Sequence, residues 1–364
     1  MLLTSSQPLA HVYDLAMLDL DGVVYVGPDA VPGAAEHVGR ARDAGMRVAF
    51  ITNNASRPPD AVAEHLTALG VKAAPDDVVT SAQAAARVLR DRFGAGARIL
   101  CLGADGLRAA LEEAGLVPLG VDDEADAVAS GYGPDLRWGD LMRVAVRIRD
   151  GLPWVASNTD HTIPTPYGVA PGHGVLVDML SRFTGVTPEV AGKPSRPLLD
   201  ETIRRVGGSR PLMVGDRLDT DIEGARNAGI DSLLVLAGVT GLAELVAAGP
   251  ALRPTYLSPD LAGLTTAHPA PADDGERWVL GGWAGSVREG RLQIEPTEPT
   301  EPTEPTEPTE PTEPTEPTEA TGAGSAEADW WRVAAATAWH HLDTTGAVVD
   351  IAGLRVPGRD RPAR

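Results

Sequence analysis

Short apolar runs alternate with amphipathic stretches through the first 265 residues of the chain. Apolar runs at residues 15–20 and 47–51 are typical of strands buried on both faces, and residues 78–81 are expected to form a third strand that runs into a helix cap at Ser81. Amphipathic stretches at about 34–44 and 56–69 are typical of helices that cover such strands. Alternation of strand and helix predicts a parallel sheet with helices on its faces.

A second α/β block interrupts this first unit. We expect its strands at 98–102, 125–130 and 154–157 and its helices at 105–114, 138–149 and 172–184. The first sheet resumes near residue 190, with helices at 196–206 and 222–228 and strands at 211–214, 232–236 and 254–257. We therefore predict a core of residues 12–82 and 188–265 with an inserted domain of residues 83–187.

The remainder of the chain changes character. Residues 266–276 are rich in Ala, Pro and Asp and are typical of a linker, and a hairpin (278–283 and 291–294), a helix (329–342) and a strand (347–351) are expected beyond it. We predict a small C-terminal domain of residues 277–294 and 326–356, interrupted at 295–325. That interruption holds Glu-Pro-Thr eight times, a period that excludes helix and sheet and favours polyproline II. The repeat is either a tolerated loop expansion or a docking tract for a proline-binding partner.

The expected fold class is α/β: a doubly wound, Rossmann-like parallel-sheet core, an inserted α/β cap domain and a small C-terminal α+β appendage. The formal charge of −20 arises from 51 acidic and 31 basic residues, and nine of the acids are repeat glutamates from Glu295 to Glu319. An acidic body without a basic stripe argues against nucleic-acid partners and against docking on anionic membranes. A small-molecule substrate is therefore expected.

Location is predicted from what the chain contains. Cys101 is the single cysteine, so an intramolecular disulfide is excluded, which suits a reducing compartment. The chain has neither a basic start followed by an apolar segment nor an apolar run approaching ~18–20 residues. We expect a cytoplasmic protein without membrane insertion.

The chemistry concentrates where the first apolar run ends. The run ends in two carboxylates, Asp19 and Asp21, followed at once by Gly22, and ligands of doubly wound sheets bind beyond the carboxyl ends of strands. Residues i and i+2 of an extended segment point to the same side, roughly 6.5–7 Å apart, which fits a phosphoryl group. One carboxylate can attack phosphorus while the other donates a proton to the leaving oxygen, and such close like charges favour a bound Mg²⁺. Taken alone, this stretch is equally typical of a strand-ending turn.

Three later segments lie beside strand ends or helix starts: Thr52-Asn53-Asn54, Gly192-Lys193-Pro194, and Gly215-Asp216 followed by Asp221. Together with Asp19-Leu20-Asp21-Gly22, they resemble the four motifs of the haloacid dehalogenase superfamily of phosphatases. Within that superfamily the chain resembles subclass IIA, whose members carry a C2-type α/β cap between the second and third motifs. The resemblance covers about residues 12–265.

This resemblance implies a role for each motif. Asp19 matches the nucleophile and Asp21 the general acid and base. Mg²⁺ is implied as the cofactor, and its expected ligands are Asp19, the backbone carbonyl of Asp21 and Asp216, with Asp221 supporting the metal shell.

Phosphate oxygens are expected to meet the Thr52 hydroxyl, the Asn53 amide and the Lys193 ammonium. Lys193 is one of only two lysines in the chain. Asp219, between the two acidic positions of the fourth motif, is expected only to cap the following helix.

The inserted domain is expected to select the ester. The polar stretch Asn158-Thr159-Asp160-His161 is similar to the equivalent stretch of actinobacterial glycerol 3-phosphate phosphatases. A small polyol requires buried hydrogen-bonding groups, so Asn158, Asp160 and His161 are candidate substrate contacts, with turn or cap residues as the alternative.

The expected function is thus Mg²⁺-dependent hydrolysis of a small phosphate ester through an aspartyl-phosphate, with glycerol 3-phosphate as the leading substrate. Phosphoglycolate, 4-nitrophenyl phosphate and nucleotide phosphates are the alternatives. A non-catalytic regulatory scaffold is disfavoured because Asp19, Asp21, Lys193 and Asp216 are all present. Caps of this subclass imply a homodimer that pairs through the cap.

Overall fold

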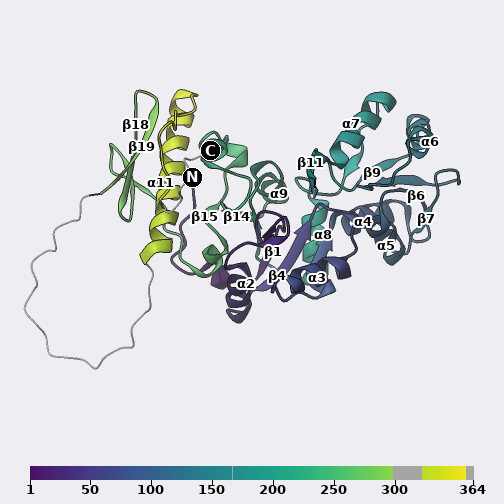
Figure 1. Ribbon diagram of the computed structural model, residues 1–364, viewed down its shortest axis with the longest axis horizontal. Helices are drawn as coiled ribbons and strands as arrows, with labels where there is room; N and C mark the ends of the chain where they lie inside the picture. Colours follow the sequence, from purple (N-terminus) through teal and green to yellow (C-terminus); the bar gives the residue numbers. More distant parts are fainter. Residues whose placement is uncertain (166, 298–321, 358–364) are drawn as a thin grey trace, which may run out of the picture.

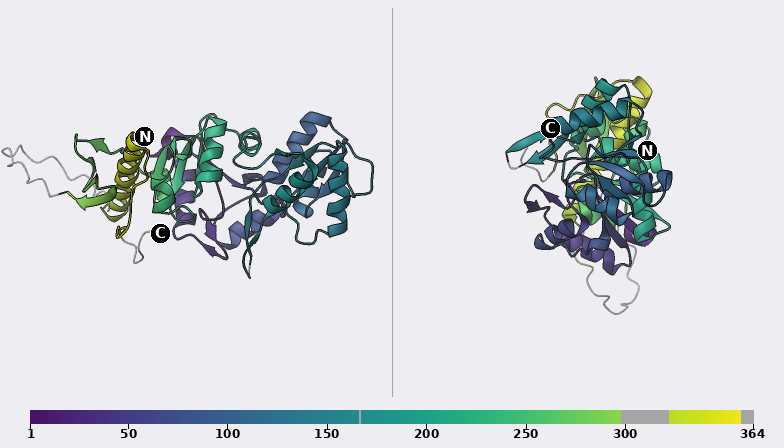
Figure 2. Two further views of the ribbon diagram at one scale, coloured as in Figure 1. Left: turned by 90° about the horizontal axis from the view of Figure 1, so that it is seen from above. Right: turned by 90° about the vertical axis from the view of Figure 1, so that its right-hand side faces the viewer.

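The computed structural model describes residues 1–165, 167–297 and 322–357. Three units lie in a row: the cap on the right of Figure 1, the core in the middle and the C-terminal unit on the left. The same order is visible from above in Figure 2. Most of the Glu-Pro-Thr repeat lies outside the described residues.

The core is built on a parallel six-stranded sheet. Its strands are β1 (Leu15–Leu18), β4 (Arg47–Thr52), β5 (Val78–Thr80), β13 (Pro211–Gly215), β14 (Asp231–Val235) and β15 (Tyr256–Ser258), in the order β15-β14-β13-β1-β4-β5. The chain leaves β1 toward β4 on one side and later returns through β13 on the other. The carboxyl end of β1 is therefore the switch point where open α/β sheets bind ligands.

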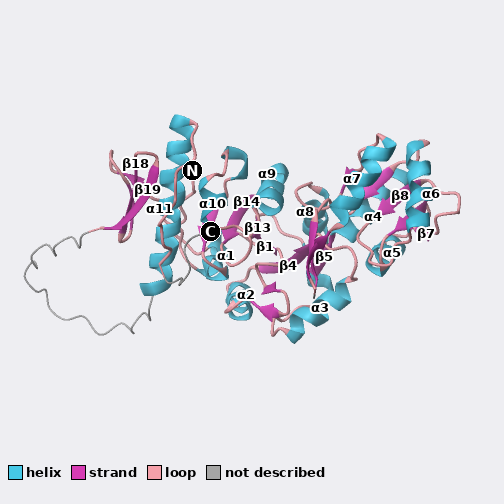
Figure 3. Cartoon of the chain, turned by 45° about the horizontal axis from the view of Figure 1, so that its top comes forward, coloured by secondary structure: helices cyan, strands magenta, loops and turns pink. Residues whose placement is uncertain are grey.

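Both faces of this sheet are buried, as the apolar runs predicted. Leu18 and Phe50 belong to the apolar cluster on one face, and Met17 and Ile51 belong to the cluster on the other. The helices around the sheet, drawn in cyan in Figure 3, are α1 (Leu9–Val12), α2 (Ala34–Asp43), α3 (Pro59–Ala68), α4 (Ser81–Phe93), α8 (Pro197–Val206), α9 (Glu223–Ala228) and α10 (Leu242–Val246). Helix α4 begins at a Thr80 cap with a reciprocal Gln83 bond, one residue before the Ser81 cap expected from sequence.

The cap has its own parallel sheet, in the order β12-β9-β8-β6-β7. Its elements are β6 (Arg98–Leu102), α5 (Asp105–Glu113), β7 (Val117–Leu119), β8 (Ala127–Ser130), α6 (Trp138–Arg149), β9 (Trp154–Ala156), the hairpin β10 (Thr162–Thr165) and β11 (Gly168–Pro171), α7 (His173–Thr184) and β12 (Glu189–Val190). Strand β12 pairs with β9, although the sequence analysis placed residues from 188 onward in the core.

Core and cap share one apolar cluster. Met17 and Ile51 of the core sheet and Val155 of the cap sheet belong to it, with the alanines of α4 between them. Separation of the two units would expose this surface to water, at a cost of about 25 cal/mol per Å². The cap is therefore packed on the core through α4 rather than joined only by its connecting loops.

The C-terminal unit is an antiparallel sheet covered by one long helix. The strands are β16 (Ala272–Asp273), β17 (Trp278–Leu280), β18 (Trp283–Arg288) and β19 (Arg291–Pro296), and the helix is α11 (Gly322–Thr345). Three expectations were wrong in detail: the stretch expected as a linker contains β16, the strand expected at 347–351 is reduced to a single bridge between Arg291 and Asp350, and α11 begins at Gly322 rather than at 329. The tail sheet uses residues 272–273 because pairing with β17 satisfies their backbone groups.

Helix α11 packs directly on the core. The indole Nε1 of Trp339 donates to the Leu245 carbonyl at 2.7 Å, and Arg253 makes two 2.7 Å hydrogen bonds to Asp343. Trp330 and Trp339 are almost fully buried in a cluster that includes Leu234 of the core sheet. The tail therefore completes the core. Within the described residues, the helices are too short or too polar to cross a bilayer.

Replacement of Trp339 by alanine should lower the free energy of unfolding by about 3–5 kcal/mol, because a large buried side chain and its hydrogen bond are lost. Tyr167 is 84% exposed on the cap, so Tyr167→Ala is the matched control and should change the free energy of unfolding by less than about 0.5 kcal/mol. Urea unfolding followed by circular dichroism measures both. Equal effects would contradict the packing of α11 on the core.

Candidate active site

The site lies where three neighbouring strands of the core sheet end. Register pairs Leu18 of β1 with Phe50 of β4 and with Val214 of β13, so the residues that follow these strands gather at one edge. Asp19 and Asp21 come from β1, Thr52 and Asn53 from β4, and Asp216 from β13. Parallel pairing therefore brings together the motifs that the sequence spreads over 200 residues.

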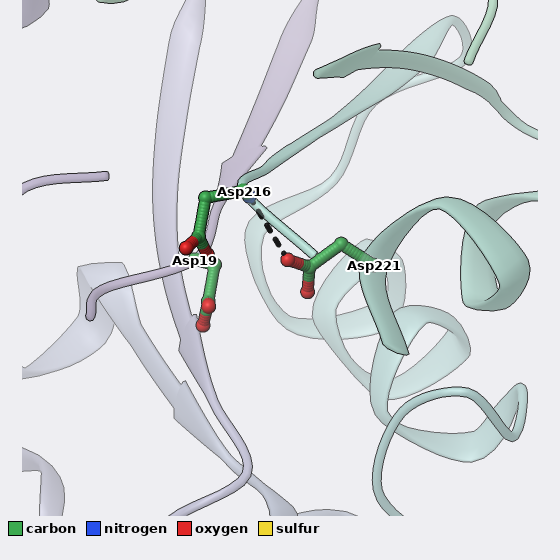
Figure 4. Close-up of side chains that lie close together, drawn as sticks. All are labelled: Asp19, Asp216 and Asp221. Atoms are coloured by element: carbon green, nitrogen blue, oxygen red, sulfur yellow. Dashed lines mark hydrogen bonds between the residues drawn. The ribbon is translucent and has the colours of Figure 1, made fainter. Parts of the chain in front are cut away.

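Three carboxylates form the centre of this edge. One oxygen from each of Asp19, Asp216 and Asp221 lies within 4.8 Å of the others (Figure 4). Asp216 and Asp221 are fully buried, and the Asp19 side chain is 13% exposed. Like charges at this separation repel one another strongly in a buried site, so the cluster requires cations.

Lys193 supplies one of these cations. Its Nζ lies 2.8 Å from Asp19 Oδ1 and 2.7 Å from Asp221 Oδ1, and the side chain is 2% exposed. Burial opposes the charge of Lys193, but the two carboxylates outweigh it and raise its pKa. Because three carboxylates face one ammonium, the ionised cluster keeps two negative charges, which is the complement of one divalent cation.

Asp216 has an oxygen free for such a cation. Its Oδ2 accepts the Val239 N–H at 2.6 Å, while its Oδ1 is buried without a hydrogen-bond partner. Gly22 and Gly238 lie so close that an added Cβ would stand 2.2 and 2.0 Å from Asp216 Oδ2. The sequence analysis missed Gly238 and Val239, because a loop after β14 carries no recognisable signal of this contact.

Asp221 has a different environment. Its Oδ2 accepts the backbone N–H groups of Asp216 and Arg217, both at 3.1 Å, and its Oδ1 meets Lys193. Both oxygens therefore already fix the loop after β13 and the lysine, so Asp221 lies within the cluster as an organiser of its geometry. Asp219, expected to cap a helix, holds the Arg217 guanidinium through two hydrogen bonds of 3.1 and 2.8 Å instead.

Asp21 lies at the open side of the site. The carboxylate is exposed, at the start of a turn in which Gly22 donates to the Tyr25 carbonyl. Desolvation by the surrounding protein raises the pKa of Asp21, and the Arg57 and Lys193 charges lower it in part. A raised pKa favours the protonated carboxyl that a general acid needs. Arg57 was not singled out in the sequence.

Thr52 and Asn53 differ in their availability. The Thr52 hydroxyl oxygen accepts the Asn54 N–H at 3.1 Å, so its own proton is left to donate. The Asn53 amide is fully engaged: its oxygen accepts the Lys193 N–H, and its nitrogen donates to the Lys193 carbonyl and to Asp160. Both protons of this amide therefore have protein acceptors, and its expected donation to phosphate stays a prediction.

The three cap candidates separate in the structure. Asp160 approaches the core, with Oδ1 3.0 Å from Asn53 Nδ2, and burial raises its pKa. Asn158 is buried and donates to the Asn53 carbonyl at 2.6 Å, so it braces the cap on the core. His161 is exposed and lies 2.9 Å from Asp178 on α7, turned toward the cap surface.

The donor set fits Mg²⁺. Carboxylate oxygens are hard ligands, the cluster has two uncompensated negative charges, and Asp216 Oδ1 is a buried acceptor without a partner. Asp19 and Asp216 would hold the ion, and the Asp21 carbonyl stays an expectation from the sequence.

Comparison with known proteins agrees with this geometry. Residues 16–117 match the model described as haloacid dehalogenase-like hydrolase, and residues 190–264 match a second model of HAD-like hydrolases. The chain is 44% identical over 257 residues to D-glycerol 3-phosphate phosphatase of Mycobacterium tuberculosis, covering 70% of this chain and 72% of the relative. It belongs to the haloacid dehalogenase-like hydrolases and is a phosphatase of that family.

Two solved structures of phosphatases are also similar to this chain. A glycerol phosphate phosphatase of M. tuberculosis in complex with magnesium is 35% identical, with a TM-score of 0.76 over 98% of this chain and 97% of the other. A 4-nitrophenylphosphatase of Thermotoga maritima is 31% identical, with a TM-score of 0.66 over 71% of this chain and 98% of the other. The first similarity includes the C-terminal unit, whereas the second covers less of this chain.

The charge cluster predicts how pH and Mg²⁺ act together. Burial and neighbouring carboxylates raise the pKa of Asp216 from 3.8 to about 8, and burial raises that of Asp221 from 3.8 to about 6 against the pull of Lys193. At pH values between 3.8 and these raised pKa values, the folded protein without metal binds more protons than the unfolded chain. Its free energy of unfolding therefore falls as pH rises. Mg²⁺ should therefore raise the melting temperature more at about pH 8 than at about pH 5.5.

Thermal unfolding in Mg²⁺ and in EDTA at the two pH values measures this difference. Asp216→Asn should remove the difference between the Mg²⁺ effects at the two pH values. Asp219→Asn, which alters an exposed ion pair, should leave that difference unchanged. A stabilisation by Mg²⁺ that is equal at both pH values would contradict the assignment.

Proposed function

We propose that the protein is a Mg²⁺-dependent phosphatase that releases inorganic phosphate from glycerol 3-phosphate. The observation that carries this proposal is the buried Lys193 that bridges Asp19 and Asp221 beside the unpartnered Asp216 oxygen. The similarity to glycerol 3-phosphate phosphatase supports the choice of ester.

The residues define a two-step reaction. An Asp19 oxygen attacks phosphorus, the bond from phosphorus to the ester oxygen breaks, and Asp21 donates its proton to the departing alkoxide. Asp21 then accepts a proton from water, which attacks the aspartyl-phosphate and releases phosphate with Asp19 restored. When bound, Mg²⁺ neutralises the charge between phosphate and carboxylates.

Two groups of the chain stabilise the transferring phosphoryl group in this scheme. Lys193 Nζ, already at Asp19 Oδ1, is placed beside the equatorial oxygens, and the Thr52 hydroxyl has a proton to donate to one of them. The cap loop that carries Asp160 lies against this edge of the core, so the cap is the unit that would select the alcohol portion of the ester. Glycerol 3-phosphate is a precursor of glycerophospholipids, so we place the enzyme in that metabolism and in the cytoplasm.

Glycerol 3-phosphate should give the highest kcat/KM in a panel with phosphoglycolate, 4-nitrophenyl phosphate and a nucleotide monophosphate, measured as phosphate release with Mg²⁺. Asp19→Asn should lower kcat by at least about 10⁴-fold because the nucleophile is lost. A different leading ester would overturn the substrate assignment, and turnover by folded Asp19→Asn would overturn the mechanism.

We further propose that two copies pair through the cap. Trp138, Met142 and Val146 recur every fourth residue along α6 and are 64%, 58% and 40% exposed. An apolar stripe on one helix is self-complementary about a twofold axis, and its burial would stabilise a symmetric dimer.

Met142→Glu should therefore shift the protein from dimer to monomer, because two carboxylates would meet at the axis. Sedimentation velocity measures the shift. Val239→Glu, on a core residue that is 63% exposed, is the control. A monomeric wild-type protein would refute the pairing.

A further inference from the structure

Asn53 is the junction of four segments of the chain. It follows β4, and its carbonyl accepts hydrogen bonds from Ser81 at the start of α4 and from Asn158 of the cap, both at 2.6 Å. Its side chain reaches Lys193 and Asp160. The residue is 8% exposed, so these bonds form away from competing water.

The Asn53 side-chain amide forms hydrogen bonds with both backbone groups of Lys193. Its oxygen accepts the Lys193 N–H at 2.8 Å, and its nitrogen donates to the Lys193 carbonyl at 3.0 Å. Two such bonds fix the position and orientation of that peptide segment. Because the Lys193 side chain starts from this segment, they also set where Nζ lies between Asp19 and Asp221.

Asp160 orients the amide from the cap side. An amide nitrogen has two protons; one goes to the Lys193 carbonyl, and the other goes to Asp160 Oδ1 at 3.0 Å. Without Asp160 the second proton loses its acceptor in a buried site, and the ring of hydrogen bonds around Lys193 loosens.

The cap loop is itself held firmly. Gly174 donates to the Asp160 carbonyl, and His173 Nδ1 contacts the Asn158 carbonyl, both at 2.8 Å at the start of α7. An added Cβ at Gly174 would lie 2.1 Å from the Thr159 carbonyl oxygen. The start of α7 therefore fixes the position of Asp160, so Asp160 moves together with the cap.

We infer that Asp160 and Asn53 are a positioning pair that couples the placement of the cap to the placement of Lys193, and that Asp160 is not a substrate contact. This inference rests on the proposed function. A cap in its packed position completes the hydrogen bonds of the Asn53 amide, and Lys193 is then aligned for phosphoryl transfer.

Steady-state kinetics of Asp160→Ala tests this role. We expect kcat to fall about 10–100-fold while KM changes less than about threefold, as for other residues that orient a catalytic group. The factor should be equal for glycerol 3-phosphate and 4-nitrophenyl phosphate, since Lys193 acts on the phosphoryl group common to both. A loss that falls on KM, or on one ester only, would show a substrate contact and overturn the inference.

Two variants accompany it. Asp160→Asn keeps an acceptor oxygen and should restore kcat to within about threefold of wild type. Asp178→Ala removes an exposed carboxylate of the same cap and should leave kcat unchanged. An unchanged kcat in Asp160→Ala, or equal losses in all three variants, would refute the pair.

Exchange of the carboxylate and the amide between positions 53 and 160 tests the coupling even where Asp160→Ala does not fold. Asn53→Asp sets two carboxylates within hydrogen-bond distance and should be slower than the double variant Asn53→Asp with Asp160→Asn, in which donor and acceptor of the 53–160 bond are exchanged while the bond to the Lys193 carbonyl is lost equally in both. A double variant no faster than Asn53→Asp alone would contradict the coupling.

Binding of orthovanadate separates this inference from the substrate assignment. Vanadate imitates the transferring phosphoryl group, so its affinity should weaken in Asp160→Ala and recover in Asp160→Asn, whichever ester the enzyme hydrolyses. If the wild type hydrolyses none of the esters, the proposed function fails while this affinity still decides the role of Asp160. Equal vanadate affinity in Asp160→Ala and wild type would overturn the positioning role.

Discussion

The ion pairs of Lys193 are the interaction on which the site depends. A buried ammonium between Asp19 and Asp221 offsets part of the repulsion among three carboxylates that the sheet forces together. Removal of one partner from such a buried group is strongly destabilising, because the remaining charges lose their compensation. The same contacts place the ammonium beside Asp19, the carboxylate proposed as nucleophile, so charge compensation and the proposed chemistry use one geometry.

That geometry needs glycine at several points. Side chains at Gly22, Gly215 and Gly238 would collide with the carboxylates of Asp216 or Asp221. The backbone approaches closely enough to donate to these carboxylates only because Cβ atoms are absent, and Gly22 also has a positive φ of 82°. The packing of small residues around the acids thus fixes their positions before any ligand binds.

The cap and the tail extend the core in different ways. The cap shares an apolar cluster with the core through α4 and reaches the site through Asn158 and Asp160. The tail covers the other end through α11, far along the row of units from the cap (Figure 1). The cap is therefore the unit placed to influence chemistry, and the tail is placed to stabilise the sheet that carries the motifs.

The sequence by itself determined the strand-helix order, the inserted cap and the four motifs, because apolar periodicity and residue type are local properties of the chain. It placed Asp19, Thr52, Lys193 and Asp216 at strand ends or a helix start, and parallel pairing then required most of them to meet. Only the tertiary structure decided that Asn53 holds Lys193, that His161 faces away from the core and that Gly238 makes room for Asp216. These outcomes depend on distances between residues remote in the chain, which no local pattern encodes.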